Sequence, residues 1–284
     1  MIAGARPAGR AAVLGSPIAH SLSPALHRAA YRELGLTDWT YSAIECDEQR
    51  LPSLLDSLGP DWAGLSLTMP LKRAVLPLLD HVEPLATRVG AANTVVFTAG
   101  QRHGFNTDVG GIVTALRQAG VTTGGNVLVL GSGATACSAL AALDAIGGAA
   151  VCVAVRAVAR AQPLLAVADR LGMQVAVIDY GVALVSRPWQ LLISTIPAAG
   201  AEPVATQLRT GTLAADAVFD VVYDPWPTPL AAAADDVGSA VISGFDMLVH
   251  QAAGQVELMT GRPAPVSAMR AAGLAELTRT RNIR

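Results

Sequence analysis

The sequence predicts an α/β fold made of two α/β lobes, and three observations support this prediction. Short apolar runs of strand length alternate along the chain with segments of helix length, an order typical of parallel α/β proteins. A glycine-rich turn follows one of these runs near the middle of the chain. Hydrophobic residues make up 52% of the 284 residues and charged residues only 15%, so the chain can bury a large core.

The first lobe begins with an apolar strand at residues 10–15 and a polar loop. Ser23 is the expected N-cap of the helix that follows, with Pro24 as its first residue, because a serine oxygen and a fixed proline φ both suit a helix start. Gly35 ends this helix. Further strands are predicted at 40–46, 63–67 and 92–97, with helical stretches between them.

A second α/β run begins with an apolar strand that leads into the glycine turn, at residues 126–133, and a helix follows at 134–147. Its later elements are a helix at 159–171 and strands at 149–156, 174–179, 190–197 and 217–225. We place a dinucleotide-type lobe at about 108–245. Residues 244–261 have helical apolar spacing, and spacing alone leaves open which lobe this helix joins.

Composition excludes several classes of function. A net charge of −2 gives no basic surface for nucleic acid or for an anionic membrane. Cys46, Cys137 and Cys152 are widely spaced and lack metal-ligand spacing, so we expect no metal site and a reduced, cytoplasmic protein. We also expect no signal peptide at the N-terminus and no membrane span.

The glycine turn has the form Gly131-x-Gly133-x-x-Ala136 between a strand and a helix. The first glycine suits the tight turn, and the second lets backbone N–H groups approach a pyrophosphate at the helix N-terminus. A small third residue lets the helix pack on the strand. The alternative is a strand–helix turn that binds no ligand.

The strand after this helix ends in arginines and lacks the acidic residue that binds the ribose 2′-hydroxyl in NAD sites. Arg156 and Arg160 are four residues apart, and two guanidinium groups suit a dianionic 2′-phosphate. The alternative is a pair of solvated arginines at a helix start. The sequence therefore favours NADP(H) over NAD.

Lys72 is the only lysine among the 20 Lys and Arg residues of the chain. An ammonium group can supply both positive charge and a proton to an oxygen that gains negative charge, whereas guanidinium supplies only charge. Compositional bias toward arginine is the alternative explanation. We interpret Lys72 as a catalytic candidate.

Three further loops carry small polar side chains where we expect an apolar strand to have just ended, and the strand-end loops of open α/β sheets are where ligands bind. Neutral hydroxyl and amide groups suit a substrate with several hydroxyls and one carboxylate. Each group also has an ordinary structural explanation, as a helix cap or a turn residue. The residues are Ser21, Ser23, Asn93, Thr94, Asn106, Thr107 and Asp108.

Motifs along nearly the whole chain resemble those of the shikimate dehydrogenase family. They are VLGSPIAHSLSPALH, SLTMPLK, GAANT, GFNTD, the glycine turn, STIP, DVVYDPWPTPL and GFDMLVHQ. The resemblance implies NADP-dependent reduction of 3-dehydroshikimate to shikimate in aromatic amino-acid biosynthesis. It also implies a substrate lobe of residues 1–107 completed by C-terminal helices at 246–284, with a Rossmann-type NADP lobe inserted at 108–245.

The resemblance further assigns roles to single residues. Ser21 and Ser23 would hold the substrate carboxylate; Thr68, Asn93 and Gln251 would bind its ring hydroxyls; Lys72 and Asp108 would be the catalytic pair in contact with substrate; and Tyr223 would lie near substrate and nicotinamide. The cofactor-binding residues would be Gly131, Ser132, Gly133, Ala134, Thr135, Arg156, Arg160 and Gly244.

The chain departs from the family pattern at two places. Ser66 stands where the family has asparagine, so a substrate contact from that side chain is shortened or lost. Val155 and Ala157 replace polar residues on either side of Arg156, which weakens the argument for a strong NADP preference.

Alternative functions also stay open at this point. A quinate or quinate/shikimate dehydrogenase, an aminoshikimate enzyme, and a catalytically silent NADP(H) or shikimate sensor are the alternatives. The expected assembly is a monomer or homodimer, with no nucleic-acid or membrane partner.

Overall fold

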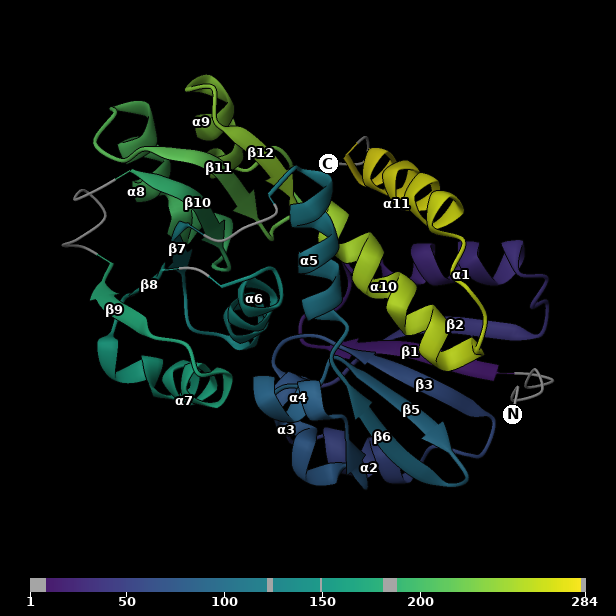
Figure 1. Ribbon diagram of the computed structural model, residues 1–284. Helices are drawn as coiled ribbons and strands as arrows, with labels where there is room; N and C mark the ends of the chain where they lie inside the picture. Colours follow the sequence, from purple (N-terminus) through teal and green to yellow (C-terminus); the bar gives the residue numbers. More distant parts are fainter. Residues whose placement is uncertain (1–8, 122–124, 149, 181–187, 282–284) are drawn as a thin grey trace. The chain divides into compact units, whose positions relative to one another are not determined.

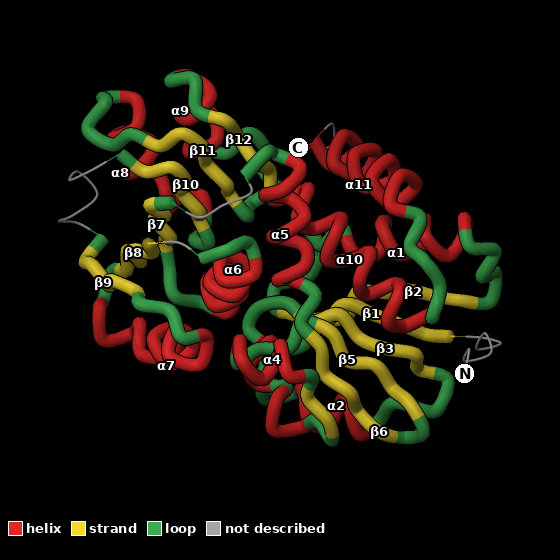
Figure 2. The backbone as a smooth tube through the Cα atoms, viewed as in Figure 1, coloured by secondary structure: helices red, strands yellow, loops and turns green. Residues whose placement is uncertain are grey.

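The computed structural model describes residues 9–121, 125–148, 150–180 and 188–281. The chain forms two compact units, Met1–Thr107 with Val249–Arg284, and Asp108–Leu248. Each unit is built on its own β-sheet with helices packed against it, as Figure 1 and Figure 2 show, so the predicted α/β fold is confirmed. The N-terminal segment considered for a signal peptide extends into residues 1–8, and the predicted strand at 149–156 begins at residue 149. These positions lie outside the described residues.

The first unit contains a mixed sheet with the strand order β2-β1-β3-β5-β6-β4. Its strands are β1 (Gly9–Gly15), β2 (Trp39–Glu45), β3 (Trp62–Leu67), β4 (His81–Val82), β5 (Thr94–Thr98) and β6 (Gln101–Phe105). Strand β1 pairs parallel with β2 and β3, whereas β5 runs antiparallel to both β3 and β6. The start of β5 therefore lies at the same edge as the ends of β1, β3 and β6.

Helices cover both faces of this sheet (Figure 2). They are α1 (Ser23–Glu33), α2 (Leu51–Asp56), α3 (Leu71–Ala74), the 3₁₀ turn η1 (Leu76–Leu78), α4 (Pro84–Val89), α10 (Gly244–Thr260, from Val249 onward) and α11 (Val266–Arg281). Leu65 and Leu67 of β3 pack with residues of α2 and α3 in one core. Met259 of α10 packs against Gly64 of β3, and α11 packs on α1. The C-terminal helices thus belong to the first unit, as the family resemblance implied.

The second unit contains a parallel sheet with the order β12-β11-β10-β7-β8-β9. Its strands are β7 (Asn126–Leu130), β8 (Ala150–Val155), β9 (Val175–Asp179), β10 (Trp189–Ser194), β11 (Ala215–Asp220) and β12 (Ala240–Ser243). The strand order reverses beside β7, and ligands of open α/β sheets bind at the carboxyl ends of strands near such a point.

Two helix layers sandwich this second sheet. Helices α8 (Ala198–Arg209) and α9 (Pro229–Asp236) pack together, and residues of both join a core with Leu128 and Leu192 of the sheet. The other helices are α5 (Asp108–Gln118), α6 (Ala134–Ala145), the 3₁₀ turn η2 (Val158–Ala161) and α7 (Gln162–Leu171). Helix α6 packs between α5 and α7. Within the described ranges, no helix is long and apolar enough to cross a membrane.

Several predicted element boundaries were wrong. Ser23 is the first residue of α1 rather than its N-cap, and Leu22 occupies the cap position without a capping side-chain bond. The backbone N–H of Ser23 instead donates to Ser21 Oγ at 3.3 Å. The strand expected to lead into the glycine turn within 126–133 ends at Leu130, and the strands predicted at 190–197 and 217–225 end at Ser194 and Asp220, because the chain turns there into loops. The helix predicted at 159–171 begins as the 3₁₀ turn η2.

A fully buried histidine lies on the α1 side of the first sheet. The His27 ring stacks on Tyr41, with ring centroids 4.0 Å apart, and its relative exposure is 0%. Burial lowers the pKa of His27 from 6.5 to about 3, and a hydrogen bond with Gln255 opposes this effect only in part. His27 is therefore neutral in the folded protein at neutral pH.

We expect this burial to make the protein less stable as the pH falls. The unfolded chain takes up a proton at His27 near pH 6.5, whereas the folded chain does so only near pH 3, so protons favour unfolding across this window. The free energy of unfolding should fall with decreasing pH by up to about 1.4 kcal/mol per pH unit more than in His27→Gln. Urea denaturation at several pH values from about 7 to 4.5 measures this difference in slope. Equal slopes in the two proteins would contradict it.

Candidate functional site

Most of the polar residues singled out in the sequence lie on segments that meet at one edge of the first sheet. Leu14 of β1 pairs with Leu67 of β3, Ser66 pairs with Thr94 of β5, and Thr94 pairs with Phe105 of β6. The segments that leave or enter the sheet at these pairs are therefore neighbours. They carry Ser21, Ser23, Thr68, Lys72, Asn93 and Thr107.

Asn93 is the centre of this edge and is 1% exposed. Its Oδ1 accepts from the backbone N–H of Thr107 at 2.8 Å. Its Nδ2 donates to Thr107 Oγ1 at 2.9 Å and to Gln251 Oε1 of α10 at 3.2 Å. The structure thus brings together Asn93 and Gln251, which are 158 residues apart in the sequence.

The loop after β3 places Thr68 and Lys72 at the same edge. The N–H of Thr68 donates to Leu14 O at 2.9 Å, and the side chain of Thr68 lies close against Gly15. Lys72 lies in α3 and is partly buried, and its carbonyl oxygen accepts from the N–H of Ala92 at 2.8 Å. A backbone hydrogen bond therefore links Lys72 to the residue before Asn93.

Asp108 directly follows Thr107, whose N–H is held by Asn93, and it is the first residue of α5. Its relative exposure is 2%. A carboxylate in the first turn of a helix is stabilised by the positive end of the helix dipole.

The glycine turn of the second unit has the form that the sequence predicted. Gly131 follows β7 with φ +101°, and a Cβ there would lie 2.8 Å from both Ile196 Cγ2 and Thr195 Oγ1. Gly133 is the N-cap of α6 with φ −74°, and nothing lies within 4 Å of its Cβ position. Ala136 is fully buried. Gly131 is required by both conformation and space, whereas Gly133 leaves the helix N-terminus open to an anion.

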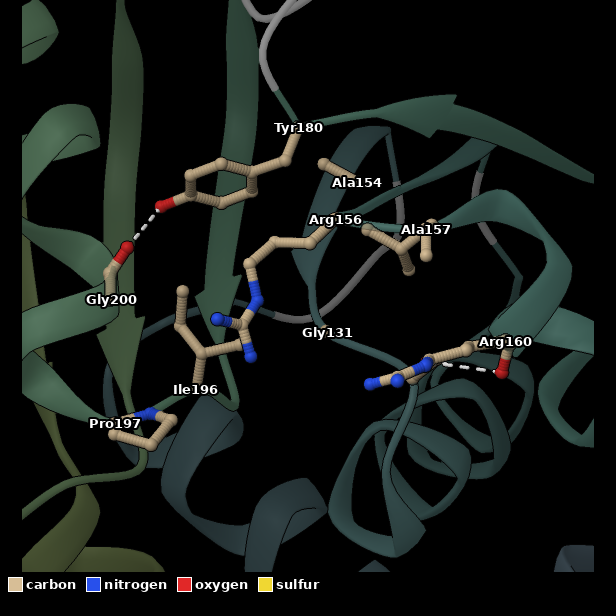
Figure 3. A pocket seen from close by; sticks show the side chains of 11 residues that line it. Gly131, Ala154, Arg156, Ala157, Arg160, Tyr180, Ile196, Pro197 and Gly200 are labelled. Atoms are coloured by element: carbon tan, nitrogen blue, oxygen red, sulfur yellow. Dashed lines mark hydrogen bonds between the residues drawn. The ribbon is translucent and has the colours of Figure 1, made fainter.

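A cavity of about 370 Å³ opens beside this turn (Figure 3). Arg156, at the end of β8, and Arg160, in η2, both line it. Arg160 O accepts a weak hydrogen bond from Ser132 Oγ at 3.5 Å. The other lining residues are Gly131, Ser132, Ala154, Val155, Ala157, Tyr180, Ile196, Pro197 and Gly200. This set joins the glycine turn to both predicted arginines.

Tyr180 is a cavity residue that sequence reasoning missed. Its hydroxyl donates to Gly200 O at 2.6 Å, which fixes the ring across the cavity from Arg160 (Figure 3). Burial raises the pKa of Tyr180, opposed by the charge of Arg156, so the side chain stays a neutral phenol. The only sequence signal for this residue was its place directly after β9, at the carboxyl edge of the sheet.

The remaining predicted residues lie at the carboxyl ends of β11 and β12. Tyr223 belongs to a loop held at both ends, since Asp220 accepts from the N–H of Val222 at 3.2 Å and from the Thr228 hydroxyl at 2.7 Å. Burial raises the pKa of Asp220, and these hydrogen bonds oppose the effect. Gly244 starts α10, where a Cβ would collide with the carbonyl of Val221. Of the described residues predicted to bind cofactor, Gly133, Ala134, Thr135 and Gly244 lie outside the cavity lining.

Ser66 takes part in the hydrogen bonding beneath the edge of the first sheet where Asn93 lies. It is 3% exposed, and its hydroxyl accepts from Tyr41 and donates to Gln255 of α10. Gln255 was also missed by sequence reasoning, because its partners lie 161 to 228 residues away. Among the residues that the structure describes, no group of three His, Cys, Asp or Glu side chains could hold a metal ion.

Comparison with known proteins finds matches to two family models and to full-length relatives. The chain matches the family model for the shikimate dehydrogenase substrate binding domain at residues 13–95, and that for the shikimate 5′-dehydrogenase C-terminal domain at residues 244–272. The shikimate dehydrogenase (NADP(+)) of Geobacter metallireducens is 36% identical over 276 residues, which cover 94% of this chain and 96% of that protein.

Two solved structures extend the comparison to three dimensions. The crystal structure of Mycobacterium tuberculosis shikimate dehydrogenase is 44% identical, has a TM-score of 0.83, and the match covers 94% of this chain and 99% of that one. The shikimate 5-dehydrogenase of Thermus thermophilus, in complex with NADP(H) and shikimate, is 33% identical, with a TM-score of 0.79 and coverage of 94% and 99%.

The two glycines of the turn should respond differently to the same substitution. Gly131→Ala should lower the free energy of unfolding by about 1–3 kcal/mol, because alanine is strained at this positive φ and its Cβ would be crowded. Gly133→Ala should leave it unchanged or raise it by up to about 1 kcal/mol, since the conformation there is compatible with alanine. Urea denaturation of both variants measures the difference. Equal losses would show that the turn is not built as described.

Proposed function

The chain belongs to the shikimate dehydrogenase family, and we propose that Lys72 and Asp108 are its catalytic pair. The protein catalyses the NADP-dependent interconversion of 3-dehydroshikimate and shikimate, and it is an oxidoreductase of aromatic amino-acid biosynthesis. Residues 1–107 with 246–284 act as the substrate-binding lobe in this proposal, and residues 108–245 as the NADP-binding lobe. The observation that carries the proposal is the convergence of Lys72, Asn93 and Gln251 on one sheet edge.

The edge of the first sheet that carries Thr68, Lys72, Asn93 and Gln251, which we call the substrate edge, suits a small polyhydroxylated acid. Buried amide groups of Asn93 and Gln251 offer neutral donors and acceptors for ring hydroxyls, and Thr68 lies at the same edge. Ser21 and Ser23 follow β1 and would bind the carboxylate through their hydroxyl groups. Neutral partners of this kind give orientation and specificity in a small-molecule site.

Lys72 would act as the proton donor to the oxygen of the carbonyl group that is reduced. When NADPH is bound, it supplies the hydride to the carbonyl carbon. The carbonyl oxygen would then gain negative charge, and the Lys72 ammonium would donate a proton to it, which yields the hydroxyl of shikimate. Asp108 would position the Lys72 ammonium and the substrate hydroxyl relative to each other. In the reverse direction, the Lys72 amine accepts the proton of that hydroxyl.

The residues of the second unit fit NADP(H). The absence of a Cβ at Gly133 leaves the α6 N-terminus open for the pyrophosphate, and Gly131, Ser132, Ala134 and Thr135 belong to the same turn. Arg156 and Arg160 would bind the 2′-phosphate from two sides of the cavity. Tyr223 and Gly244 lie at strand ends on the same edge of this sheet, and we assign them to the nicotinamide end.

Assembly and location complete the proposal. We propose that the protein is a monomer or homodimer. The three cysteines are buried and form no disulfide among the residues that the structure describes, which supports a reducing, cytoplasmic location.

The reaction is tested by following the absorbance of the reduced nicotinamide while shikimate and quinate are each combined with NADP⁺ and NAD⁺. Turnover of shikimate with NADP⁺ is the expected result. Preferential turnover of quinate, or of either substrate with NAD⁺, would instead place the protein in the quinate/shikimate branch. No turnover in any of the four combinations would favour a protein that senses NADP(H) or shikimate without catalysis.

Replacement of Lys72 tests its catalytic role. Lys72→Ala should lower kcat by about 100-fold or more, with a smaller change in KM for shikimate, because the proton donation strengthens only in the transition state. Lys72→Arg keeps the charge and should lose most of the same activity, since guanidinium does not give up its proton. Steady-state kinetics in both directions measure these effects. Near-normal kcat in Lys72→Arg would show that charge alone is sufficient.

Replacement of the cavity arginines tests cofactor selection. Arg156→Ala and Arg160→Ala should each raise KM for NADP⁺ by about 10-fold or more, because each removes a charge-assisted hydrogen bond to the 2′-phosphate worth about 1.5–3 kcal/mol. KM for NAD⁺ should change by less than about twofold, since NAD⁺ lacks this phosphate. Arg117→Ala, in α5 of the same unit, is the matched control. Parallel losses with both cofactors would contradict the assignment.

A further inference from the structure

The amide group of Gln255 is buried and makes four hydrogen bonds. Its Oε1 accepts from Ser66 Oγ at 2.7 Å and lies 3.3 Å from His27 Nε2. Its Nε2 donates to Asn93 O and to Thr94 Oγ1, both at 3.1 Å. Because the oxygen only accepts and the nitrogen only donates, the amide has one orientation, and His27 must carry its proton on Nε2.

The orientation of Gln255 is passed to Asn93 through Thr94. The Thr94 hydroxyl accepts from Gln255, so its own proton points to Asn93 Oδ1, at 2.9 Å. Asn93 Oδ1 also accepts from the N–H of Thr107. These two donors fix Oδ1 on one side of the Asn93 amide, and its Nδ2 therefore faces Gln251 and Thr107 Oγ1.

Gln251 and Gln255 are four residues apart on α10, and both reach the start of β5. Residues at this spacing lie on the same helix face. Gln251 contacts the side chain of Asn93, and Gln255 contacts its backbone carbonyl. Since Gln251 presents its oxygen to Asn93, its amide nitrogen lies on the other side of the group.

The far end of the network reaches the predicted carboxylate site. Ser66 Oγ accepts from the Tyr41 hydroxyl at 2.6 Å. Burial raises the pKa of Tyr41, and hydrogen bonds with Ser66 and Ser23 oppose this effect. Ser23 is one of the two serines assigned to the substrate carboxylate. Gln255 therefore connects two groups of residues by hydrogen bonds. One group is assigned to the ring hydroxyls, and the other, Ser66 and Tyr41, leads to the serine assigned to the substrate carboxylate.

We propose that Gln255 is a positioning residue for shikimate, which sets the amide orientations of Asn93 and Gln251 without touching the substrate. This inference rests on the proposed function, in which Asn93 and Gln251 bind the ring hydroxyls. An unoriented Asn93 would present oxygen and nitrogen in either order, and substrate hydroxyls would lose their matched partners.

The test replaces Gln255 with methionine, which keeps the length of the side chain and removes its amide. Gln255→Met should raise KM for shikimate by about 10-fold, the loss of about one oriented hydrogen bond, with kcat within about threefold. KM for NADP⁺ should stay within about twofold, because the residues assigned to the cofactor belong to the other unit. Gln207→Met is the matched control, a glutamine in α8 whose Oε1 is buried and has no hydrogen-bond partner among the described residues.

A second variant tests the relay itself. Thr94→Val keeps the branched shape and removes only the hydroxyl between Gln255 and Asn93. It should also raise KM for shikimate, by about three- to tenfold. If Gln255→Met does not fold, an unchanged KM in Thr94→Val overturns the proposal. An unchanged shikimate KM in a folded Gln255→Met, or equal rises in both KM values, overturns it as well.

Asn93→Ala separates this inference from the proposed function. If Asn93→Ala leaves KM for shikimate unchanged, the assigned role of Asn93 itself fails. If Asn93→Ala raises KM whereas Gln255→Met does not, only the positioning role of Gln255 fails.

Discussion

The first unit depends on the hydrogen bonds of one buried asparagine. The N–H of Asn93 donates to Phe105 O at 3.0 Å, and its carbonyl accepts from Leu67 N at 2.7 Å and from Gln255 Nε2. Its side chain binds Thr107 and Gln251. A buried amide must satisfy all its polar atoms, so β3, β5, β6 and α10 can meet here in only one way. The substrate edge is the direct result of this constraint.

The second unit also holds its candidate binding groups at one edge of its sheet, but it does so by different means. Its cavity relies on a glycine with positive φ at Gly131 and on exposed arginines, rather than on buried amides. This difference matches the ligands that we propose for the two edges. A phosphate carries formal charge and suits mobile cations and backbone N–H groups, whereas a neutral hydroxyl is recognised only by a group held in a fixed orientation. Buried amides held by several bonds supply that orientation.

Local signals in the sequence predicted four strands of the first sheet (β1, β2, β3 and β5), five strands of the second (β7 to β11), the glycine turn and the arginines at Arg156 and Arg160. They did not predict β6, whose residues QRHGF are mostly polar, or the short strands β4 and β12, and they placed the first residue of α1 at Pro24 instead of Ser23. Gln255 was out of reach because its role depends on Ser66, Thr94 and Asn93, which only the folded chain brings near. The family resemblance supplied residue roles that spacing alone could not.

Ser66, where the family resemblance leads us to expect asparagine, has a defined place in this packing. A serine hydroxyl is shorter, and here it both accepts from Tyr41 and donates to Gln255, so it supports the substrate edge from beneath. Lys72 is linked to the same edge, because its carbonyl oxygen accepts from the N–H of Ala92, next to Asn93, and its helix starts from the Thr68 turn. In the proposed site, the backbone therefore connects the lysine to the residues assigned to the substrate hydroxyls, and a shift of the loop after β3 would move both.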